Sequence, residues 1–560
     1  MFVRVVSLAI AAWAFVVCSV SGASAQQNAP SEPSGAAGIN TEERALADLD
    51  GSGNAFVLSA AQPVSHIRFV LPPHTISTEA WLRLAARPSS EAANGRIEVA
   101  VNGGEPIVIR PQARPMEARF ALFSADLQPG ENLLEIRYST ETAAPGWIVD
   151  ARRSQLRLTL EPQRPIETLD ELERALAADF AAPRRIALDT EPGRERITLE
   201  ALVAQGIALR AGAVPLFTGE TENADLVVRI AEQTRLNDAD RAALRQGASQ
   251  GPEIAYRRDG QPRLIVTGRN LDEAAAAARL LSARSFAGHG TTFLAADAIT
   301  AARLGERQVR DARGQVQENA DLRHFAASGL PFSADQGART AVQFSTRGDA
   351  DRYGALSVMA RAALIGGEAW LYAWYGDTSE TAPANHNLLI IGPNSTAIAD
   401  VDRNAPEELH AALRAAERSR GQRGLMRLAA AAYADAGDLA AAAPGQVGET
   451  GVGVAALFRD RRAANRWIGT LTAPQTASFG DAGRSLARSD LWGALEGRAA
   501  VWSSRGVTPL DFTTDPRSLA ERAQEFAADH TRDAAFLLFG AALLMLVRGF
   551  ASRRRQRARA

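Results

Sequence analysis

The C-terminal end of the chain most constrains what it can fold into. Residues 534–547 read AAFLLFGAALLMLV and carry no charge. A helix over 534–551 spans about 27 Å, close to the hydrocarbon core of a bilayer, with Arg548 extending to the interface. Arginine fills five of the last eight positions. The positive-inside rule therefore predicts a transmembrane helix over 533–552 and a cytoplasmic tail over 553–560. A buried core helix is the alternative, which the arginines disfavour.

The N-terminal end predicts export. Residues 1–25 contain Arg4, an apolar run over 5–20 and Ala-Ser-Ala at 23–25, which together are typical of a cleavable signal peptide. Cys18 is the only cysteine and lies inside the apolar run. The mature chain therefore needs no disulfide in an oxidising compartment. Both ends together predict a single-pass protein of the bacterial inner membrane, with most of its chain in the periplasm.

Composition sets only broad limits. A chain of 560 residues has room for about three domains. The formal net charge is −2, so no strong field favours a polyanion such as nucleic acid. We expect no nucleic-acid partner.

Short alternating runs of apolar and polar residues follow a flexible leader, which is rich in Ala, Gly, Ser and Pro and covers 26–48. Residues 49–162 contain about eight such runs, and the period of two is typical of half-buried strands. Asn102-Gly103 and Pro129-Gly130 mark turns. This region predicts a jelly-roll β-sandwich.

Strands then alternate with helices, which predicts mostly parallel sheets in two α/β domains, over 163–305 and 346–508. The two domains share a layout without a convincing sequence repeat. Residues 306–345 are polar and irregular, as in a linker. Residues 513–531 have an amphipathic stripe. Their place before the membrane span favours an interfacial helix, and an ordinary core helix is the alternative.

The order of these pieces resembles the family of periplasmic regulatory subunits of bacterial cellulose synthase. The likeness covers most of the mature chain, and the stretches that carry it are 67–72, 81–84, 97–103, 127–134, 251–252 and 264–281. Members of the family usually carry a second jelly roll between two flavodoxin-like domains. In this chain only about forty residues separate the two α/β domains, which is too few for a second jelly roll. The chain therefore resembles a shortened or divergent member, which serves cellulose or another exported polysaccharide.

The resemblance implies a non-catalytic subunit without a cofactor. In the family, the terminal helix packs on the membrane glycosyltransferase, the cellulose synthase catalytic subunit, and the periplasmic domains receive the emerging glucan. Gly540, Ala541 and Ala542 form a small-residue patch in the predicted span, which suits close helix packing. A stand-alone, membrane-tethered periplasmic glycan-binding or envelope-sensing protein is the alternative function.

Aromatic and polar residues of the predicted sandwich are the candidate sugar contacts. Sugars stack on exposed aromatic rings, and charged side chains bind their hydroxyls. Trp81 and Trp147 supply the rings, with Arg83 and Asp150 close to them in sequence. The alternative for both tryptophans is a place in the hydrophobic core.

Enzymatic motifs are weak. Residues 247–251 match G-x-S-x-G around Ser249, but a predicted helix precedes them and Pro252 follows, whereas a nucleophile elbow needs a strand before and a helix after. The seven histidines lack metal-ligand spacing. We therefore expect no enzymatic activity, no metal and no cofactor.

Overall fold

The computed structural model describes part of the chain, and its described residues form two compact units. Described are residues 40–50, 54–90, 95–140, 145–245, 251–283, 285–294, 320–393, 399–405, 409, 452–460, 463, 466–473 and 479–510. The predicted signal peptide, interfacial helix, membrane span and tail lie outside these ranges. Unit 1 is Met1–Pro183 and unit 2 is Arg184–Ala560. No described helix combines the length and the apolar character that crossing a membrane requires.

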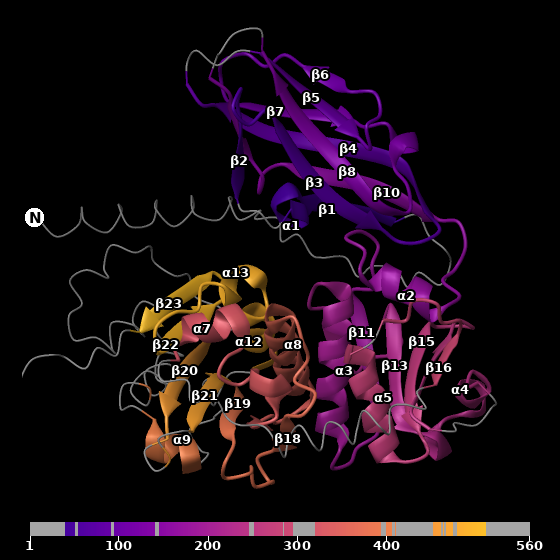
Figure 1. Ribbon diagram of the computed structural model, residues 1–560, viewed down its shortest axis with the longest axis vertical. Coiled ribbons are helices and arrows are strands. Elements are labelled where there is room, and N and C mark those ends of the chain that lie inside the picture. Colours follow the sequence, from indigo (N-terminus) through magenta and orange to yellow (C-terminus); the bar gives the residue numbers. More distant parts are fainter. Residues whose placement is uncertain are drawn as a thin grey trace, which may run out of the picture. The chain divides into compact units, whose positions relative to one another are not determined.

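Unit 1 is a sandwich of two antiparallel sheets (Figure 1). Sheet A contains β1 (Asn40–Ala45), β10 (Gln155–Pro162), β4 (Thr75–Pro88), β9 (Trp147–Asp150) and β2 (Ala55–Leu58) in this order, with β7 (Met116–Ala121) paired to β4. Sheet B contains β3 (Val64–Leu71), β8 (Gly130–Ser139), β5 (Arg96–Val101) and β6 (Ile107–Ile109). The chain passes repeatedly from one sheet to the other between β3 and β9, as in a jelly roll.

The predicted period of two builds the core of the sandwich. In β4, Leu82 and Leu84 are fully buried, whereas Trp81 and Arg83, which alternate with them, are only half-buried. Successive side chains of a strand point to opposite faces, so one face of β4 packs inward and the other stays accessible. The predicted turn after β5 is present, with φ of 50° at Asn102 and 73° at Gly103.

Both ends of the sandwich differ from the predicted range of 49–162. Residues 40–45, placed by the sequence in the flexible leader, form β1 and pair along their whole length with β10. An edge strand is held by backbone hydrogen bonds and needs no apolar run, so the sequence gives no signal. At the other end, Phe180 is buried in the same core, with its ring centroid 5.9 Å from that of Phe69.

Glu171 ties helix α2 (Leu169–Leu176) to the turn between β3 and β4. Its carboxylate accepts hydrogen bonds from the backbone N–H of Glu167 at 2.7 Å and from the guanidinium of Arg164 at 2.6 Å, and it lies 2.8 Å from the His74 ring nitrogen Nε2. Burial raises the pKa of this carboxyl. The hydrogen bonds from Glu167, His74 and Arg164 outweigh burial and lower the pKa to about 2.

We predict that Glu171→Gln destabilises unit 1 in a pH-dependent way. A lowered pKa means that the carboxylate stabilises the folded state above its ordinary pKa of 4.5 and loses that effect as the pH falls toward 2. At pH 7 the variant should lose about 3 kcal/mol of unfolding free energy, and the difference from wild type should shrink between pH 4.5 and 2. Urea unfolding at several pH values measures this. Asp170→Asn, on the exposed side of α2, is the control and should cost less than about 1 kcal/mol.

Unit 2 consists of two α/β lobes with matching topology. Sheet C contains β12 (Leu216–Thr218), β11 (Arg185–Thr190), β13 (Leu226–Glu232), β15 (Arg263–Gly268), β14 (Glu253–Arg257) and β16 (Thr292–Leu294). Sheet D contains β18 (Trp374–Asp377), β17 (Thr340–Phe344), β19 (Asn387–Pro393), β21 (Trp467–Ala473), β20 (Gly453–Arg459), β22 (Ala499–Ser503) and β23 (Gly506–Leu510). In each sheet the first four strands are parallel and the fifth is antiparallel. The predicted similarity of layout thus extends to strand order and direction.

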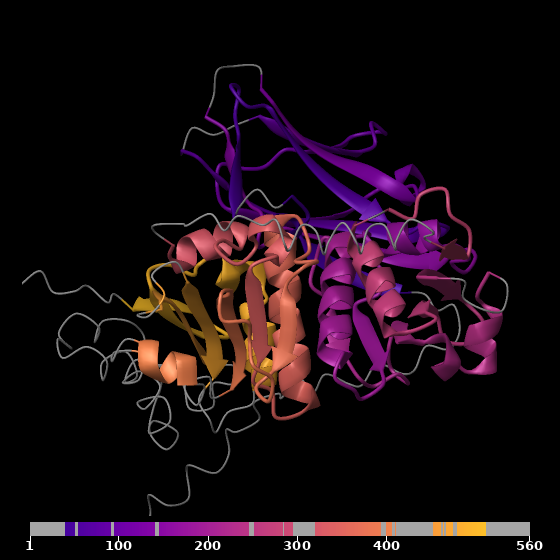
Figure 2. The ribbon, with the colours of Figure 1, turned by 60° about the horizontal axis from the view of Figure 1, so that its bottom comes forward.

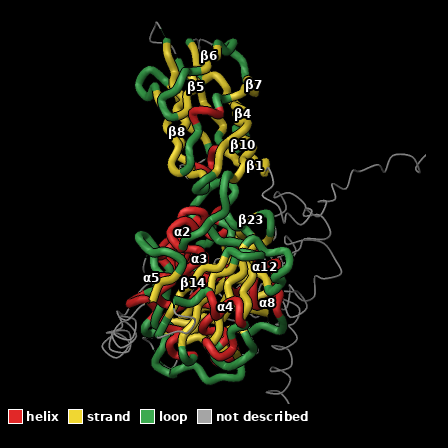
Figure 3. Tube along the Cα trace, turned by 90° about the vertical axis from the view of Figure 1, so that its right-hand side faces the viewer, coloured by secondary structure: helices red, strands yellow, loops and turns green. Residues whose placement is uncertain are grey.

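Helices surround these sheets (Figure 3). They are α3 (Arg196–Ala211), α4 (Asp238–Ala242) and α5 (Leu271–Ala283) in the first lobe, and α7 (Leu322–Ser328), α8 (Asp349–Gly366), α9 (Ala399–Asn404), α12 (Phe479–Leu486) and α13 (Ser489–Trp492) in the second. One sequence prediction is wrong here, because the predicted linker 306–345 contains α7 and β17.

The two lobes meet through α3 and α8, which lie side by side (Figures 1 and 2). Glu200 of α3 is fully buried, 2.9 Å from the guanidinium of Arg196 and 2.9 Å from that of Arg352 on α8. Burial raises the pKa of Glu200, and the positive charges of Arg352 and Arg196 oppose this. The N-terminal parts of both helices meet at this ion pair. Arg194, in the loop after β11, also pairs with Glu380, in the loop after β18, at 2.8 Å. The carboxyl ends of the parallel strands in both sheets therefore lie at the same end of unit 2.

Gln205 forms a second buried polar link between the lobes. Its side-chain amide donates to the Tyr375 hydroxyl at 2.9 Å and accepts from the backbone N–H of Trp370 at 2.9 Å. Tyr375 in turn donates to the carbonyl of Trp370 at 2.6 Å. The amide and the hydroxyl are therefore paired inside an interface that excludes water, which fixes the register of α3 against β18.

We predict that Gln205→Ala loosens the two lobes. The substitution leaves the buried N–H of Trp370 without its acceptor, which costs about 1–3 kcal/mol in addition to the cavity. Thermal unfolding of the full-length protein should shift to lower temperature, and amides of α3 and β18 should exchange faster with deuterium. Gln233→Ala, at a half-buried position outside the interface, should leave both measurements unchanged. Equal exchange rates in the Gln205 variant would contradict a shared interface.

Candidate functional site

The outward face of sheet A carries one half-buried aromatic ring among charged side chains. Trp81 stands in the central strand β4, directly opposite Ala121 of β7 and Arg157 of β10. The guanidinium carbon of Arg119 lies 4.7 Å from the centroid of the Trp81 ring. A ring in this position offers an apolar surface to solvent, with hydrogen-bond donors on both sides, which is the combination that a sugar needs for its C–H faces and hydroxyls.

A chain of polar contacts crosses this face next to the tryptophan. Glu117 of β7 pairs with Arg83 at 3.6 Å and with Arg153 at 2.9 Å. The backbone N–H of Arg153 donates to the carboxylate of Asp150 at 3.1 Å. Ala85 lies in β4 opposite Glu117, and its small side chain leaves room for the contact between Glu117 and Arg153. Arg83 also donates to the side chain of Gln155.

Three of the four predicted sugar contacts therefore share one face. Trp81 and Arg83 are two residues apart in β4, and the alternation of β9 places Asp150 on the same side as both. Trp147 is different, because it is fully buried in the core of the sandwich. For this residue the alternative of a core position is correct, and the prediction of an exposed stacking ring is wrong. β9 begins at Trp147, and its pleat directs both Trp147 and Val149 inward.

The sequence did not single out Arg119, Arg157 and Glu117. Alternation within 116–121 and 155–160 does predict that these three side chains share the polar side of their strands. These side chains lie near Trp81 only because β7 and β10 pair with β4, and these strands are far apart in the chain. Local patterns give no information about that pairing.

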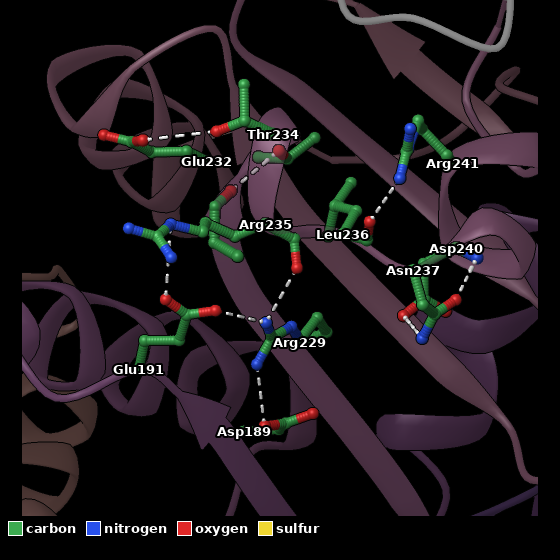
Figure 4. Close-up of polar contacts among 12 residues, drawn as sticks. Asp189, Glu191, Arg229, Glu232, Thr234, Arg235, Leu236, Asn237, Asp240 and Arg241 are labelled. Atoms are coloured by element: carbon green, nitrogen blue, oxygen red, sulfur yellow. Dashed lines mark hydrogen bonds and ion pairs between the residues drawn. The ribbon is translucent and has the colours of Figure 1, made fainter.

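In the first lobe, paired charged side chains lie near the position where many open α/β sheets bind a ligand. Such ligands bind beyond the carboxyl ends of the strands, where the strand order reverses, which in sheet C is between β11 and β13. Here Arg229 lies 2.9 Å from Asp189 and 3.0 Å from Glu191 (Figure 4). Arg235 lies 3.8 Å from Glu191 and accepts a hydrogen bond from Arg229 through its carbonyl. Two positive and two negative side chains thus pair with one another.

The described residues show no metal centre. Within the described ranges, no group of three or more His, Cys, Asp and Glu side chains is arranged to hold a metal ion. Ser249 and the small-residue patch Gly540, Ala541 and Ala542 lie outside the described residues, so their predicted roles stay predictions.

Comparisons with known proteins add little. No protein-family model and no curated protein matches this chain. Among solved structures, a family 35 carbohydrate-binding module from Cellvibrio japonicus is 14% identical, with 20% of this chain and 98% of that chain covered and a TM-score of 0.14. A family 35 module from Clostridium thermocellum is 11% identical, with coverage of 21% and 98% and a TM-score of 0.15. A family two carbohydrate esterase from Cellvibrio japonicus is 15% identical, with coverage of 34% and 68% and a TM-score of 0.14.

TM-scores at this level do not establish a shared fold, and such identities say nothing about activity. The sandwich in unit 1 is defined by the pairing of its own strands. The likeness to the family of cellulose synthase regulatory subunits also stays a prediction.

We predict that the two tryptophans of the sandwich respond differently to replacement. Trp147→Phe removes packed atoms from a closed core and should lower the unfolding free energy by about 1–3 kcal/mol. Trp81→Phe keeps an apolar ring on an accessible face and should change it by less than about 0.5 kcal/mol. Denaturant unfolding of both variants compares these values. A larger loss for Trp81→Phe would contradict its accessible position.

Proposed function

We propose that this protein is a non-catalytic, membrane-anchored periplasmic subunit of a complex that makes cellulose or a related exopolysaccharide. In this proposal the outward face of sheet A binds the glycan as it leaves the membrane glycosyltransferase. The C-terminal segment anchors the chain in the inner membrane and packs on that enzyme. The signal peptide, the terminal apolar segment and the order of the domains are sequence features that support this arrangement.

The observation that carries the glycan-binding part is the position of Trp81. Of the two tryptophans in the sandwich, only Trp81 lies on an accessible face, and Arg83, Arg119 and Glu117 supply donors and acceptors near it. A flat sheet surface with a central ring suits an extended polymer better than a small molecule, which needs a concave pocket to bury most of its surface. A growing polysaccharide is such an extended ligand.

A stand-alone envelope protein that binds glycans through the same face is the second candidate. It differs from a synthase component in its partner and not in its ligand. Co-purification in mild detergent separates the two, because a membrane glycosyltransferase accompanies the protein only if the two form a complex. A preparation without such an enzyme, but with intact glycan binding, would favour the stand-alone protein.

We predict that Trp81→Ala weakens glycan binding about tenfold, as the loss of a central aromatic contact does in other interfaces. The measurement is equilibrium binding of the purified full-length protein to two soluble cellulose derivatives, hydroxyethylcellulose and carboxymethylcellulose.

Val108→Ala is the control, because Val108 is an exposed apolar residue of unit 1 in β6, which belongs to sheet B and not to sheet A. This variant should bind as wild type does. Binding that depends on Val108 instead of Trp81, or no binding to either polymer, would overturn the proposal.

A further inference from the structure

Two arginines flank Trp81 on neighbouring strands. Arg157 of β10 is directly opposite Trp81, and Arg119 of β7 stacks over its ring from the other side. Both side chains are exposed. Neighbouring strands lie about 4.8 Å apart, so β7 and β10, on opposite sides of β4, are about 10 Å apart. The two guanidinium groups therefore belong to one surface, on either side of the Trp81 ring.

Neither Arg119 nor Arg157 has a carboxylate partner among the described residues. Arg83 and Arg153 on the same face share Glu117. By contrast, the described part of the chain offers no ion pair and no side-chain hydrogen bond to Arg119 or Arg157. Glu43 stands near Arg157 on the neighbouring strand β1, but no ion pair joins them. The positive charges of these two arginines therefore remain available to a ligand.

The immediate surroundings of Trp81 are consequently positive. The face positions directly opposite Trp81 or two residues along include Arg83, Arg119 and Arg157 but only one acid, Glu79. Guanidinium groups bind carboxylates through two parallel hydrogen bonds between opposite charges, whereas a neutral hydroxyl offers neither a charge nor a second oxygen to the same fork. A ligand with carboxylates matches this arrangement better than a neutral one.

We propose that the glycan bound on this face is acidic, with carboxylate groups on successive sugars that pair with Arg119 and Arg157 while the sugar between them contacts Trp81. This inference rests on the proposed function and names the chemical class of its ligand. Its position around one ring distinguishes it from a general attraction to anions, because the charge of the whole chain is −2.

Replacement of Arg119 distinguishes an acidic from a neutral glycan by its effect on binding affinity. Its guanidinium covers one face of the Trp81 ring. For a neutral glycan, Arg119→Gln removes this cover and should leave binding unchanged or make it tighter. For an acidic glycan, the same substitution removes a charge partner and should weaken binding. The two classes of ligand therefore predict different effects of one variant, with weaker binding only for the acidic glycan.

The experiment compares full-length wild type with Arg119→Gln and Arg157→Gln. Carboxymethylcellulose is the acidic probe, and hydroxyethylcellulose is the neutral probe on the same backbone. We expect wild type to prefer the acidic polymer about tenfold at low salt, and to lose most of this preference near 1 M salt, where charges are screened beyond about 3 Å. Each arginine variant should lose about threefold in affinity for the acidic polymer, a modest effect because both side chains are exposed. Neither should lose affinity for the neutral polymer.

Arg68→Gln is the matched control, because Arg68 is an exposed arginine of unit 1 on sheet B. It removes the same charge from a different face and should leave binding to both polymers unchanged. The proposal of an acidic glycan would be overturned if wild type bound both polymers with equal affinity. It would also be overturned if Arg68→Gln lost as much affinity for the acidic polymer as the other two arginine variants. If Trp81→Ala still weakened binding in that case, the proposed glycan-binding function would stand without it.

Discussion

The pleat of β4 is the constraint on which unit 1 depends. Along this central strand Leu82 and Leu84 fill the core, and Trp81 and Arg83 take the accessible face between them. A shift by one residue would exchange the two sets and bury an arginine. The same alternation therefore decides both the packing of the sandwich and the composition of its candidate binding face. Stability and the proposed function thus depend on the same strand, and the hydrophobic residues that hold it in register are as necessary for the face as the tryptophan.

Much of this architecture could be predicted from local patterns. Short alternating runs indicated the sandwich, and the change to alternating strands and helices indicated two α/β lobes. The features that the sequence did not predict have a common cause, which is pairing between distant parts of the chain. Strand β1 has no apolar run because its partner supplies backbone hydrogen bonds. Arg119, which contacts the Trp81 ring, and Arg157, which is opposite Trp81, come from strands that are distant from β4 in sequence. Trp147 shows the same limit, since an aromatic residue at the start of a short strand reveals neither which face it joins nor how far the sheet covers it.

The lobes of unit 2 illustrate how polar residues can specify an interface. Helices α3 and α8 are buried almost all round, so apolar packing alone would allow them to slide past each other. Glu200 pairs with one arginine on each lobe, and Gln205 of α3 bonds to two residues of the second lobe. Only one register of the two helices satisfies these contacts. A buried ion pair adds little net stability, because desolvation offsets its attraction, but breaking one is costly. Glu200 and Gln205 therefore select one arrangement of the two lobes over other arrangements that would bury a comparable apolar area.

Charge also bears on the proposed binding of a polymer to the face around Trp81. Two unit charges 4 Å apart in water attract by about 1 kcal/mol, and exposed pairs lose part of that to side-chain ordering and salt. One acidic sugar held by Arg119 or Arg157 alone would therefore bind weakly. On a polymer the second carboxylate meets its guanidinium at a high effective concentration, so weak contacts combine without any one of them being strong. Each contact also breaks easily by itself, which lets a chain move along the face one sugar at a time. An open surface with dispersed arginines thus serves a moving polysaccharide better than a deep pocket with a tightly held one.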